Sequence, residues 1–293
     1  MEIIRTIAWM KERARAARAE GRTVGLVPTM GALHEGHLSL VLRARSECPT
    51  VVTSLFVNPK QFGPAEDFAK YPRAFASDAD KLERAGVTSL FAPEVAEIYP
   101  AGFSTHVEVS GLSARLEGAA RPGHFRGVTT VVMKLLQIVQ PHFAYFGRKD
   151  AQQARVVVQM ARDLNLDTEI VVCPIVREAD GLALSSRNAY LNREERKAAT
   201  VLHRALRAGR TEIAAGVRDG RELQTVMRRV LETEPLARVE YLEIVDAETF
   251  ESVTRVGRAS YALVTAYLGK TRLLDNMWLA PAGEDAEELL VEL

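Results

Sequence analysis

Cysteine is scarce in this 293-residue sequence, which contains only Cys48 and Cys173. The two residues lie far apart in the chain and form neither a CxxC pair nor a spacing typical of metal ligands. This scarcity excludes the disulfide framework that stabilises many small secreted domains. Isolated thiols are typical of a reducing compartment, so we expect the protein to be cytoplasmic.

Net charge and long apolar runs are also absent. Lysine and arginine total 38, as do aspartate and glutamate, so the composition indicates neither nucleic-acid binding nor a membrane surface. No apolar run reaches the length of about 18 residues that a membrane-spanning helix needs. The basic first 21 residues contain Glu2, Glu12 and Glu20, and we expect an amphipathic helix there rather than a targeting segment.

Apolar segments that alternate with amphipathic ones fill the first 176 residues. The amphipathic segments predict helices at 3–17, 35–46, 77–86, 124–140 and 150–165. The apolar segments predict buried strands at 23–30, 50–58, 87–93, 142–147 and 168–177. This alternation is typical of a parallel sheet covered by helices on both faces. We therefore expect residues 1–176 to form a Rossmann-like, doubly wound α/β domain.

Residues 177–293 follow a different pattern, in which helices come first and strands follow. Amphipathic segments at 192–209 and 220–235 precede apolar segments at 238–247, 260–269 and 271–280. Segregated helices and strands predict a smaller α+β domain, with the junction at 177–188. The end of the chain, residues 282–293, carries five acids and no base, and we expect it to be a solvated tail.

The segment VPTMGALHEGHLSL, residues 27–40, marks the point where the first buried strand passes into a helix. In open α/β sheets, ligands bind beyond the carboxyl ends of the strands, where the positive end of a helix dipole favours anions. Gly31 and Gly36 allow a phosphate to approach the backbone, and His34 and His37 share one face of the first helical turn. The segment predicts a polyphosphate site; a polar helix cap and a metal-binding pair remain alternatives.

Side chains suited to phosphate or carboxylate follow three further expected strands. They are Asn58 and Gln61, then Gly147, Lys149, Asp150 and Gln153, and finally Ser185, Ser186 and Arg187. Amides hold carboxylates or hydroxyls without adding charge, and a lysine supplies a cation. Each group also has a simpler interpretation as a turn or a helix cap. Four such strand ends in one chain favour a nucleotide site.

Several longer segments place these residues in a recognisable order. They are PTMGALHEGHLSL, FVNPKQF, DFAKYPR, LEGAARPGHFRGV, FGRKDAQQ, DGLALSSRNAYL and RLLDNMWL. In this order, over residues 1 to 281, the chain closely resembles the pantoate–β-alanine ligase family of nucleotidyltransferases. The segments HEGH and LSSR resemble the two phosphate-binding signatures of that superfamily.

The resemblance implies an activity and a set of partners. Members of the family join D-pantoate to β-alanine with ATP and Mg²⁺, through a pantoyl adenylate, and release AMP and pyrophosphate. A homodimer is expected, and neither nucleic acid nor a membrane is an expected partner. The resemblance implies that residues 1–176 bind ATP and pantoate, and we expect residues 177–293 to act as a lid domain.

The resemblance also implies roles for individual residues. His34, His37 and Lys149 are expected to be catalytic, with His37 the proton donor. The expected ATP-binding residues are Met30, Gly31, Ala32, Leu33, His34, Glu35, Gly36, His37, Gly147, Arg148, Lys149, Asp150, Val176, Leu184, Ser185, Ser186 and Arg187. Gln61 and Gln153 are expected to bind pantoate, with Gln61 also near β-alanine. Arg121, and less directly His124, are candidate anion contacts; no Mg²⁺ ligand is implied.

Two positions depart from the family pattern. Arg148 stands where the family usually has a glutamate, so the charge beside Lys149 is reversed and its effect on the phosphate site is left open. Some relatives have paired acids where this chain has Asp78 and Asp80, which remain candidate helpers. Two other functions stay open: a nucleotidyltransferase that adenylates a different acid, and a nucleotide-binding regulator without turnover.

Overall fold

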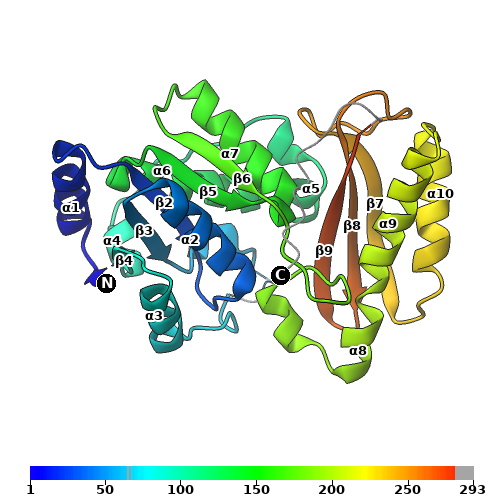
Figure 1. The fold of residues 1–293 in the computed structure, drawn as a ribbon, viewed down its shortest axis with the longest axis horizontal. Coiled ribbons are helices and arrows are strands. Elements are labelled where there is room, and N and C mark those ends of the chain that lie inside the picture. The colour runs from blue at the N-terminus through cyan, green and yellow to red at the C-terminus, as the bar shows by residue number, and fades with distance from the viewer. Residues whose placement is uncertain (65, 67, 281–293) are drawn as a thin grey trace. The chain divides into compact units, whose positions relative to one another are not determined.

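The structure, a computed structural model, describes residues 1–64, 66 and 68–280, so the expected acidic tail lies outside the described residues. The chain divides into two compact units (Figure 1). The first comprises Met1–Arg148 and Gln152–Cys173, and the second comprises Lys149–Ala151 and the chain from Pro174 onward. The boundary expected after residue 176 thus falls after Cys173, and a three-residue segment around Asp150 belongs to the second unit.

A six-stranded parallel sheet forms the centre of the first unit. Its strands are β1 (Glu2–Ile4), β2 (Val24–Thr29), β3 (Thr50–Leu55), β4 (Ser89–Phe91), β5 (Phe143–Gly147) and β6 (Glu169–Cys173). The strand order is β1-β4-β3-β2-β5-β6, which confirms the predicted doubly wound class. From β2 the chain adds strands first on one side and then, with β5, on the other. The order therefore reverses between β2 and β5, the position at which such sheets bind ligands.

Helices surround this sheet (Figure 1). They are α1 (Ile7–Ala19), α2 (Glu35–Glu47), α3 (Phe75–Arg84), α4 (Val95–Ile98), α5 (Glu117–Ala120), α6 (His124–Val139) and α7 (Ala151–Asp163). Strand side chains alternate between the two faces. Leu26 and Phe146 join the core beneath α1, α6 and α7, whereas Val27 and Tyr145 join the core beneath α2 and α3. This two-sided burial explains why the strands read as continuous apolar runs.

The expected first helix is wrong at its start. Ile3 lies in β1, where it is 41% exposed, and the helix begins only at Ile7. The β-branched pair of Ile3 and Ile4 extends along β4 as an edge strand, and Thr6 caps α1 by accepting a hydrogen bond from the Trp9 N–H at 3.4 Å. The rest of the predicted stripe is correct, because Met10, Ala14 and Ala17 are buried.

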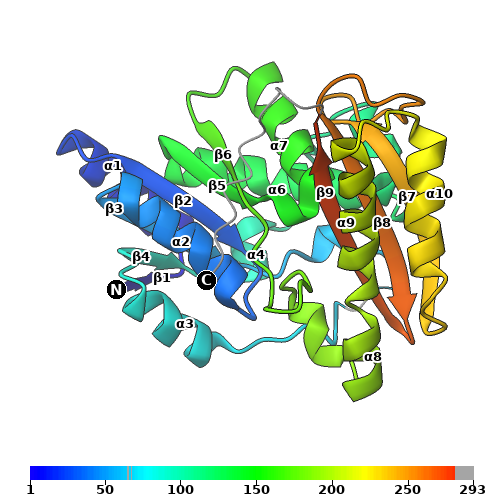
Figure 2. The same ribbon diagram turned by 45° about the vertical axis from the view of Figure 1, so that its right-hand side comes forward.

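The second unit packs helices against an antiparallel sheet (Figure 2). Its elements are α8 (Arg193–Ala198), α9 (Val201–Ala214), α10 (Gly220–Leu231), β7 (Ala237–Asp246), β8 (Ser260–Leu268) and β9 (Thr271–Leu279), with strand order β7-β8-β9. This arrangement confirms the predicted α+β class. The single helix expected at 192–209 is interrupted between Ala198 and Val201, where the Thr200 hydroxyl donates to the Lys197 carbonyl at 2.8 Å and competes with the helical ladder.

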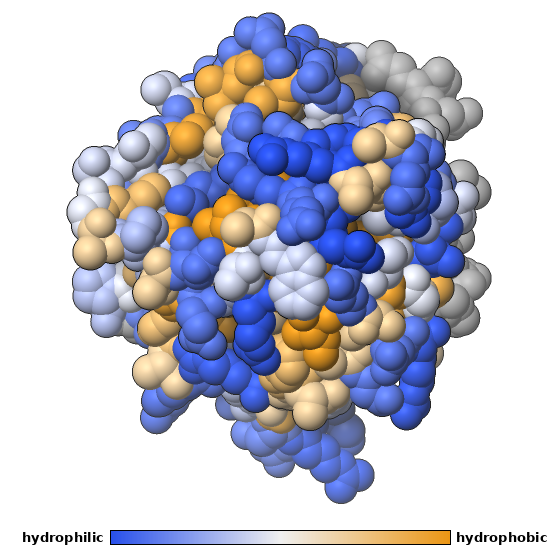
Figure 3. Space-filling view, turned by 90° about the vertical axis from the view of Figure 1, so that its left-hand side faces the viewer, coloured by the Kyte–Doolittle hydropathy of each residue, from blue (hydrophilic) through white to orange (hydrophobic). Residues whose placement is uncertain are grey.

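No helix in the described part of the chain is both long and apolar enough to cross a bilayer. The face of the molecule in Figure 3 bears mainly hydrophilic side chains. Hydrophobic side chains lie between them as small separate patches, as is usual on a protein surface.

The loop between β2 and α2 is held by α3. Gly31 and Ala32 both have left-handed backbone conformations, with φ of 88° and 53°. The carboxylate of Asp78, which is 2% exposed, accepts hydrogen bonds from the N–H groups of Ala32 at 2.8 Å and Leu33 at 2.9 Å. The Lys81 ammonium donates to the Leu33 carbonyl at 2.6 Å. Since a non-glycine residue pays for a left-handed conformation, these bonds hold the loop in place.

Replacing Asp78 therefore has a predictable cost. We expect Asp78→Ala to lower the free energy of unfolding by about 2 to 6 kcal/mol, because two N–H donors lose their partner and each such loss costs about 1–3 kcal/mol. Urea denaturation followed by circular dichroism measures this change. Asp80→Ala is the control, since Asp80 is exposed and pairs with the exposed Arg84, and it should change the free energy by less than about 0.5 kcal/mol. Equal effects of the two substitutions would contradict this role for Asp78.

Candidate active site

The two histidines of the HEGH segment meet at the N-terminus of α2, at the carboxyl end of β2. Their ring centroids are 4.1 Å apart. His34 is the N-cap residue, and its Nδ1 accepts from the Gly36 N–H at 3.2 Å. The Nδ1 of His37 accepts from the His34 N–H at 3.4 Å. The expected pair and the simpler helix-cap interpretation are therefore both correct, because the histidines cap the helix through one ring nitrogen each.

These caps set the protonation of both rings. A nitrogen that accepts a hydrogen bond carries no proton, so the neutral ring of each histidine has its proton on Nε2. The Nε2–H of His34 and the Nε2–H of His37 are then hydrogen-bond donors of neighbouring rings. Next to the positive end of α2, such a pair suits an anion with several oxygens.

The backbone of the expected ATP-binding segment, from Met30 to His37, is partly occupied by the protein itself. The N–H groups of Ala32 and Leu33 donate to Asp78, and the N–H of Gly36 donates to His34. Gly31 has little free space, because a Cβ there would lie 3.1 Å from the Asp78 carboxylate. Three backbone N–H groups of this segment are therefore already used within the protein.

Gln61 lies in a chain of polar contacts at the end of β3. It is 8% exposed and follows Asn58, which caps the short 3-10 helix η1 (Pro59–Gln61). The Gln61 Nε2 contacts the Met30 sulfur at 3.0 Å, and its Oε1 accepts from the Asn58 amide at 3.0 Å. The Tyr99 hydroxyl donates to the Asn58 Oδ1 at 2.8 Å, and burial raises the pKa of Tyr99, which keeps that proton in place. The structure thus brings Met30 and Gln61 together and fixes the amide orientation.

Arg121 is engaged by an acidic partner. Its guanidinium donates twice to Glu66, at 2.6 Å and 2.9 Å, and its Nη1 lies 3.1 Å from the His124 Nε2. His124 is buried, and its Nδ1 lies 2.9 Å from the Gln61 carbonyl. Burial and the charge of Arg121 lower the pKa of His124 to about 4, so the ring is neutral near pH 7. An anion at Arg121 would have to compete with Glu66.

Gln153 lies half-buried in the first turn of α7. Its neighbour Gln152 is buried and ties α7 to the segment before α5. The Gln152 amide donates to the carbonyls of Leu112 and Arg115, both at 2.8 Å, and accepts from the Glu117 N–H at 3.1 Å. Gln152 therefore fixes the start of the helix that carries Gln153.

Lys149 belongs to the second unit, although it directly follows β5 and Arg148. Together with Arg148 and Asp150 it forms the 3-10 helix η3 (Arg148–Asp150). The Lys149 ammonium lies 3.8 Å from the Asp150 carboxylate, and the two side chains are 21% and 49% exposed. This separation makes a weak, solvent-screened pair that a phosphate can replace. Gly147, at the end of β5, is half-buried.

The remaining expected ATP-binding residues flank a tight hairpin in the second unit. The Leu184 N–H donates to the Val176 carbonyl at 3.0 Å, so these two residues lie side by side. Ser185 caps the 3-10 helix η4 (Ser186–Tyr190), and its hydroxyl accepts from the Arg187 N–H at 3.3 Å. The helix-cap interpretation is therefore correct for Ser185, and Ser186 and Arg187 lie in the first turn of η4.

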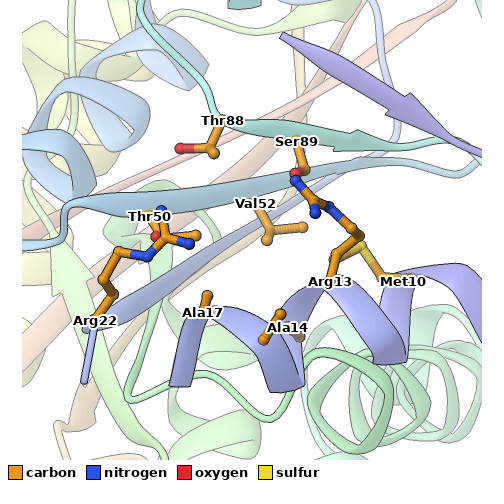
Figure 4. A pocket seen from close by; sticks show the side chains of 10 residues that line it. Met10, Arg13, Ala14, Ala17, Arg22, Thr50, Val52, Thr88 and Ser89 are labelled. Carbon is orange, nitrogen blue, oxygen red and sulfur yellow. The ribbon is translucent and has the colours of Figure 1, made fainter. Parts of the chain in front are cut away.

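A small pocket lies elsewhere in the first unit, between α1 and the amino ends of β3 and β4 (Figure 4). Its cavity volume is about 40 Å³, and it is partly open to solvent. Arg13 and Arg22 line it, but they already pair with Glu2 and Glu20. Because ligands of such sheets bind at the carboxyl ends of the strands, this pocket is not the candidate active site.

No group of three His, Cys, Asp or Glu residues in the described ranges is close enough together to hold a metal ion. Asp78, whose carboxylate contacts the loop before the HEGH segment, is occupied by backbone N–H groups. The described donor set therefore does not form a dedicated protein site for Mg²⁺.

Two residues with contacts to the expected site were missed by the sequence analysis. Asp275 and Asn276 in β9 contact Arg177 and Lys149, respectively. The sequence does contain a signal for them, because Asp275 and Asn276 are polar residues that interrupt the apolar segment RLLDNMWL. The sequence did not say which residues they contact.

Comparison with known proteins identifies the family. The family model described as Pantoate-beta-alanine ligase matches residues 2–278. The pantothenate synthetase of Acidobacterium capsulatum is 59% identical over 258 residues, which cover 88% of this chain and 86% of the relative. The pantothenate synthetase of a Roseiflexus species is 56% identical, with 94% of this chain and 98% of the relative covered.

Solved structures agree with these matches. A pantothenate synthetase from Thermus thermophilus shares 48% identity with a TM-score of 0.91, covering 96% of this chain and all of the other. A pantoate-beta-alanine ligase from Francisella tularensis, complexed with beta-gamma ATP and beta-alanine, shares 34% identity with a TM-score of 0.79 over 94% of this chain and 97% of the other. The resemblance read from the sequence segments is confirmed, and the chain belongs to the pantoate-beta-alanine ligase family.

Proposed function

We propose that this chain condenses D-pantoate with β-alanine at the expense of ATP and releases pantothenate, AMP and pyrophosphate. The observation that carries this proposal is the His34–His37 pair, whose ring centroids are 4.1 Å apart and which lies where the strand order reverses. The membership of the family supports the choice of substrates. The relative complexed with beta-gamma ATP and beta-alanine supports two of them directly.

The first step forms a pantoyl adenylate. A carboxylate oxygen of pantoate attacks the α-phosphorus of ATP, and the bond from that phosphorus to pyrophosphate breaks. Negative charge builds up on the phosphate oxygens and on the leaving pyrophosphate, so prearranged donors lower the barrier. In this proposal the Nε2–H groups of His34 and His37 donate hydrogen bonds to the phosphate oxygens and keep their protons, while Lys149 and the segment from Ser185 to Arg187 neutralise the departing charge.

The second step forms the amide. The amine of β-alanine attacks the acyl carbon of the adenylate, the carbon–oxygen bond to AMP breaks, and the amine loses a proton. We assign Gln61 and Gln153 to pantoate, and Gln61 also to β-alanine. Amide side chains suit this role, because they hold carboxylates and hydroxyls without bringing a charge to the reacting centre. The contacts of Gln61 with Met30 and Asn58 support its fixed orientation.

The rest of ATP is assigned to the second unit and the end of β5. Asp150 accepts from the ribose hydroxyls, and the backbone around Val176 and Leu184 contacts adenine. Gly147 and Arg148 lie along the nucleotide in this proposal. Mg²⁺ enters with ATP, bound by phosphate oxygens and water, as is common for this ion.

We further propose that the second unit, which comprises Lys149–Ala151 and the chain from Pro174 onward, closes as a lid when ATP binds. Closure excludes water from an adenylate that water would otherwise hydrolyse. We also propose that the protein forms a homodimer and that it acts in the cytoplasm.

The activity is tested by AMP production. With ATP and Mg²⁺ present, AMP should form stoichiometrically with pantothenate only when both pantoate and β-alanine are added. Pyrophosphate exchange should require pantoate alone, because the adenylate forms before the amine is needed. Exchange with other carboxylic acids but not with pantoate would indicate a nucleotidyltransferase of different specificity. ATP binding without consumption in every combination would indicate a regulator.

The role of Lys149 is tested in the first step. We expect Lys149→Ala to slow single-turnover formation of the adenylate by about 100-fold or more, as the loss of one donor to developing charge typically does. Rapid-quench measurement of AMP and pyrophosphate provides the rate. Lys270→Ala, at an exposed position between β8 and β9, is the control and should keep the original rate. An unchanged rate for Lys149→Ala would remove this residue from the mechanism.

Lid closure is tested by small-angle X-ray scattering. The radius of gyration should decrease when ATP and pantoate are added together, because a closed second unit makes the molecule more compact. β-Alanine alone serves as the control and should leave the radius unchanged. A radius that stays constant with ATP and pantoate at saturating concentrations would contradict closure.

A further inference from the structure

Asp275 and Asn276 are buried polar neighbours in β9 that have no role in the mechanism above. They are 3% and 2% exposed. Along the strand, Leu273 and Met277 belong to the core beneath α9 and α10, and Asp275 interrupts this apolar row. A buried carboxylate costs several kcal/mol unless it is paired. The carboxylate of Asp275 therefore needs a charged partner inside the second unit.

The partner of Asp275 is Arg177, at the start of the hairpin that leads to Ser185. The guanidinium donates to both carboxylate oxygens, at 2.7 Å and 3.0 Å. The same guanidinium donates to the carbonyls of Asn276 and Gly181, both at 3.1 Å. Such a two-pronged contact fixes distance and direction together. Arg177 therefore ties the hairpin to β9.

The hairpin itself has little freedom. Gly181 has a left-handed conformation with φ of 92°, and a Cβ there would lie 2.1 Å from the ring of His203 in α9. The bond between Leu184 and the Val176 carbonyl closes the hairpin just before Ser185. A contact at Arg177 is thus transmitted to Ser185 through a short, restrained segment.

Asn276 acts on the other expected phosphate-binding segment of this unit. Its side-chain amide donates to the backbone carbonyl of Lys149 at 2.8 Å. The backbone N–H of Asn276 donates to the Asp275 carboxylate at 2.7 Å, so this carboxylate bonds both to Arg177 and to the backbone that carries Asn276. Neighbouring strand residues project to opposite faces, which lets one short stretch of β9 contact two separate segments.

We propose that Asp275 and Asn276 are positioning residues that set the spacing between Lys149 and the Ser185–Arg187 segment. The inference rests on the proposed phosphate-binding roles of those two segments. Donors to a transition state must be held within about 0.5 Å of their productive positions, and here adjacent residues of one strand hold both. A shift of β9 moves both anchors together and preserves their spacing.

The test separates the two half-reactions. Asn276→Ala should slow single-turnover formation of the pantoyl adenylate by at least about 10-fold, since Lys149 acts when pyrophosphate leaves. Attack of β-alanine on preformed adenylate should stay within about twofold of the unsubstituted rate. Asp275→Asn, which weakens the hold on Arg177, should show the same split. A merely structural defect would lower the amplitudes of both steps by the same factor and would not separate their rate constants.

Two further variants keep the result interpretable. Asn276→Leu preserves the side-chain volume but removes the donor, and it replaces Asn276→Ala if that variant does not fold. Met277→Leu, a volume-conserving change in the adjacent core position, is the control and should keep both rates. Equal slowing of both steps, or an unchanged first step in a folded Asn276 variant, would overturn the proposal. Failure of the proposed function itself would appear separately, as absence of AMP formation by the unsubstituted chain.

Discussion

The reversal of strand order between β2 and β5 is the constraint on which the first unit depends. Parallel strands end at one edge of their sheet, and at the reversal the connections leave β2 and β5 toward opposite sides. The helix after β2 therefore presents its positive end at that edge. Placing His34 and His37 in the first turn of this helix adds two ring donors to the helix dipole, and this combination favours a polyphosphate over a neutral ligand.

Buried polar residues hold the candidate site in shape in both units. Asp78 fixes the loop before His34, Asn58 fixes the amide of Gln61, and Asn276 contacts the backbone of Lys149. In each case the side chain is at least nine-tenths buried and bonds to a backbone group or to the side chain of a site residue. A buried polar group costs free energy unless it is satisfied, so such groups favour one conformation of the segment that they contact.

The sequence predicted most of the fold because its signals are local. The order of apolar and amphipathic segments was enough to predict the fold class of both domains. The position of HEGH directly after an apolar run was enough to place it at the carboxyl edge of the sheet. The errors have physical causes. Ile3 fits the helical stripe but lies in an edge strand, and the helix expected at 192–209 is interrupted where Thr200 bonds to the backbone. Neither contact changes the periodicity of the sequence.

The sequence by itself determined the family, the two fold classes and the chemical types of the candidate residues, since motifs and periodicity are written in the order of the residues. Only the tertiary structure decided which polar groups are already occupied. Arg121 is predicted to contact an anion, and the structure pairs it with Glu66; Asp78 is a candidate helper, and the structure bonds it to two backbone N–H groups. The physical reason is that hydrogen bonds join residues 45 to 127 positions apart. Such pairings depend on the packing of whole elements and leave no local pattern in the chain.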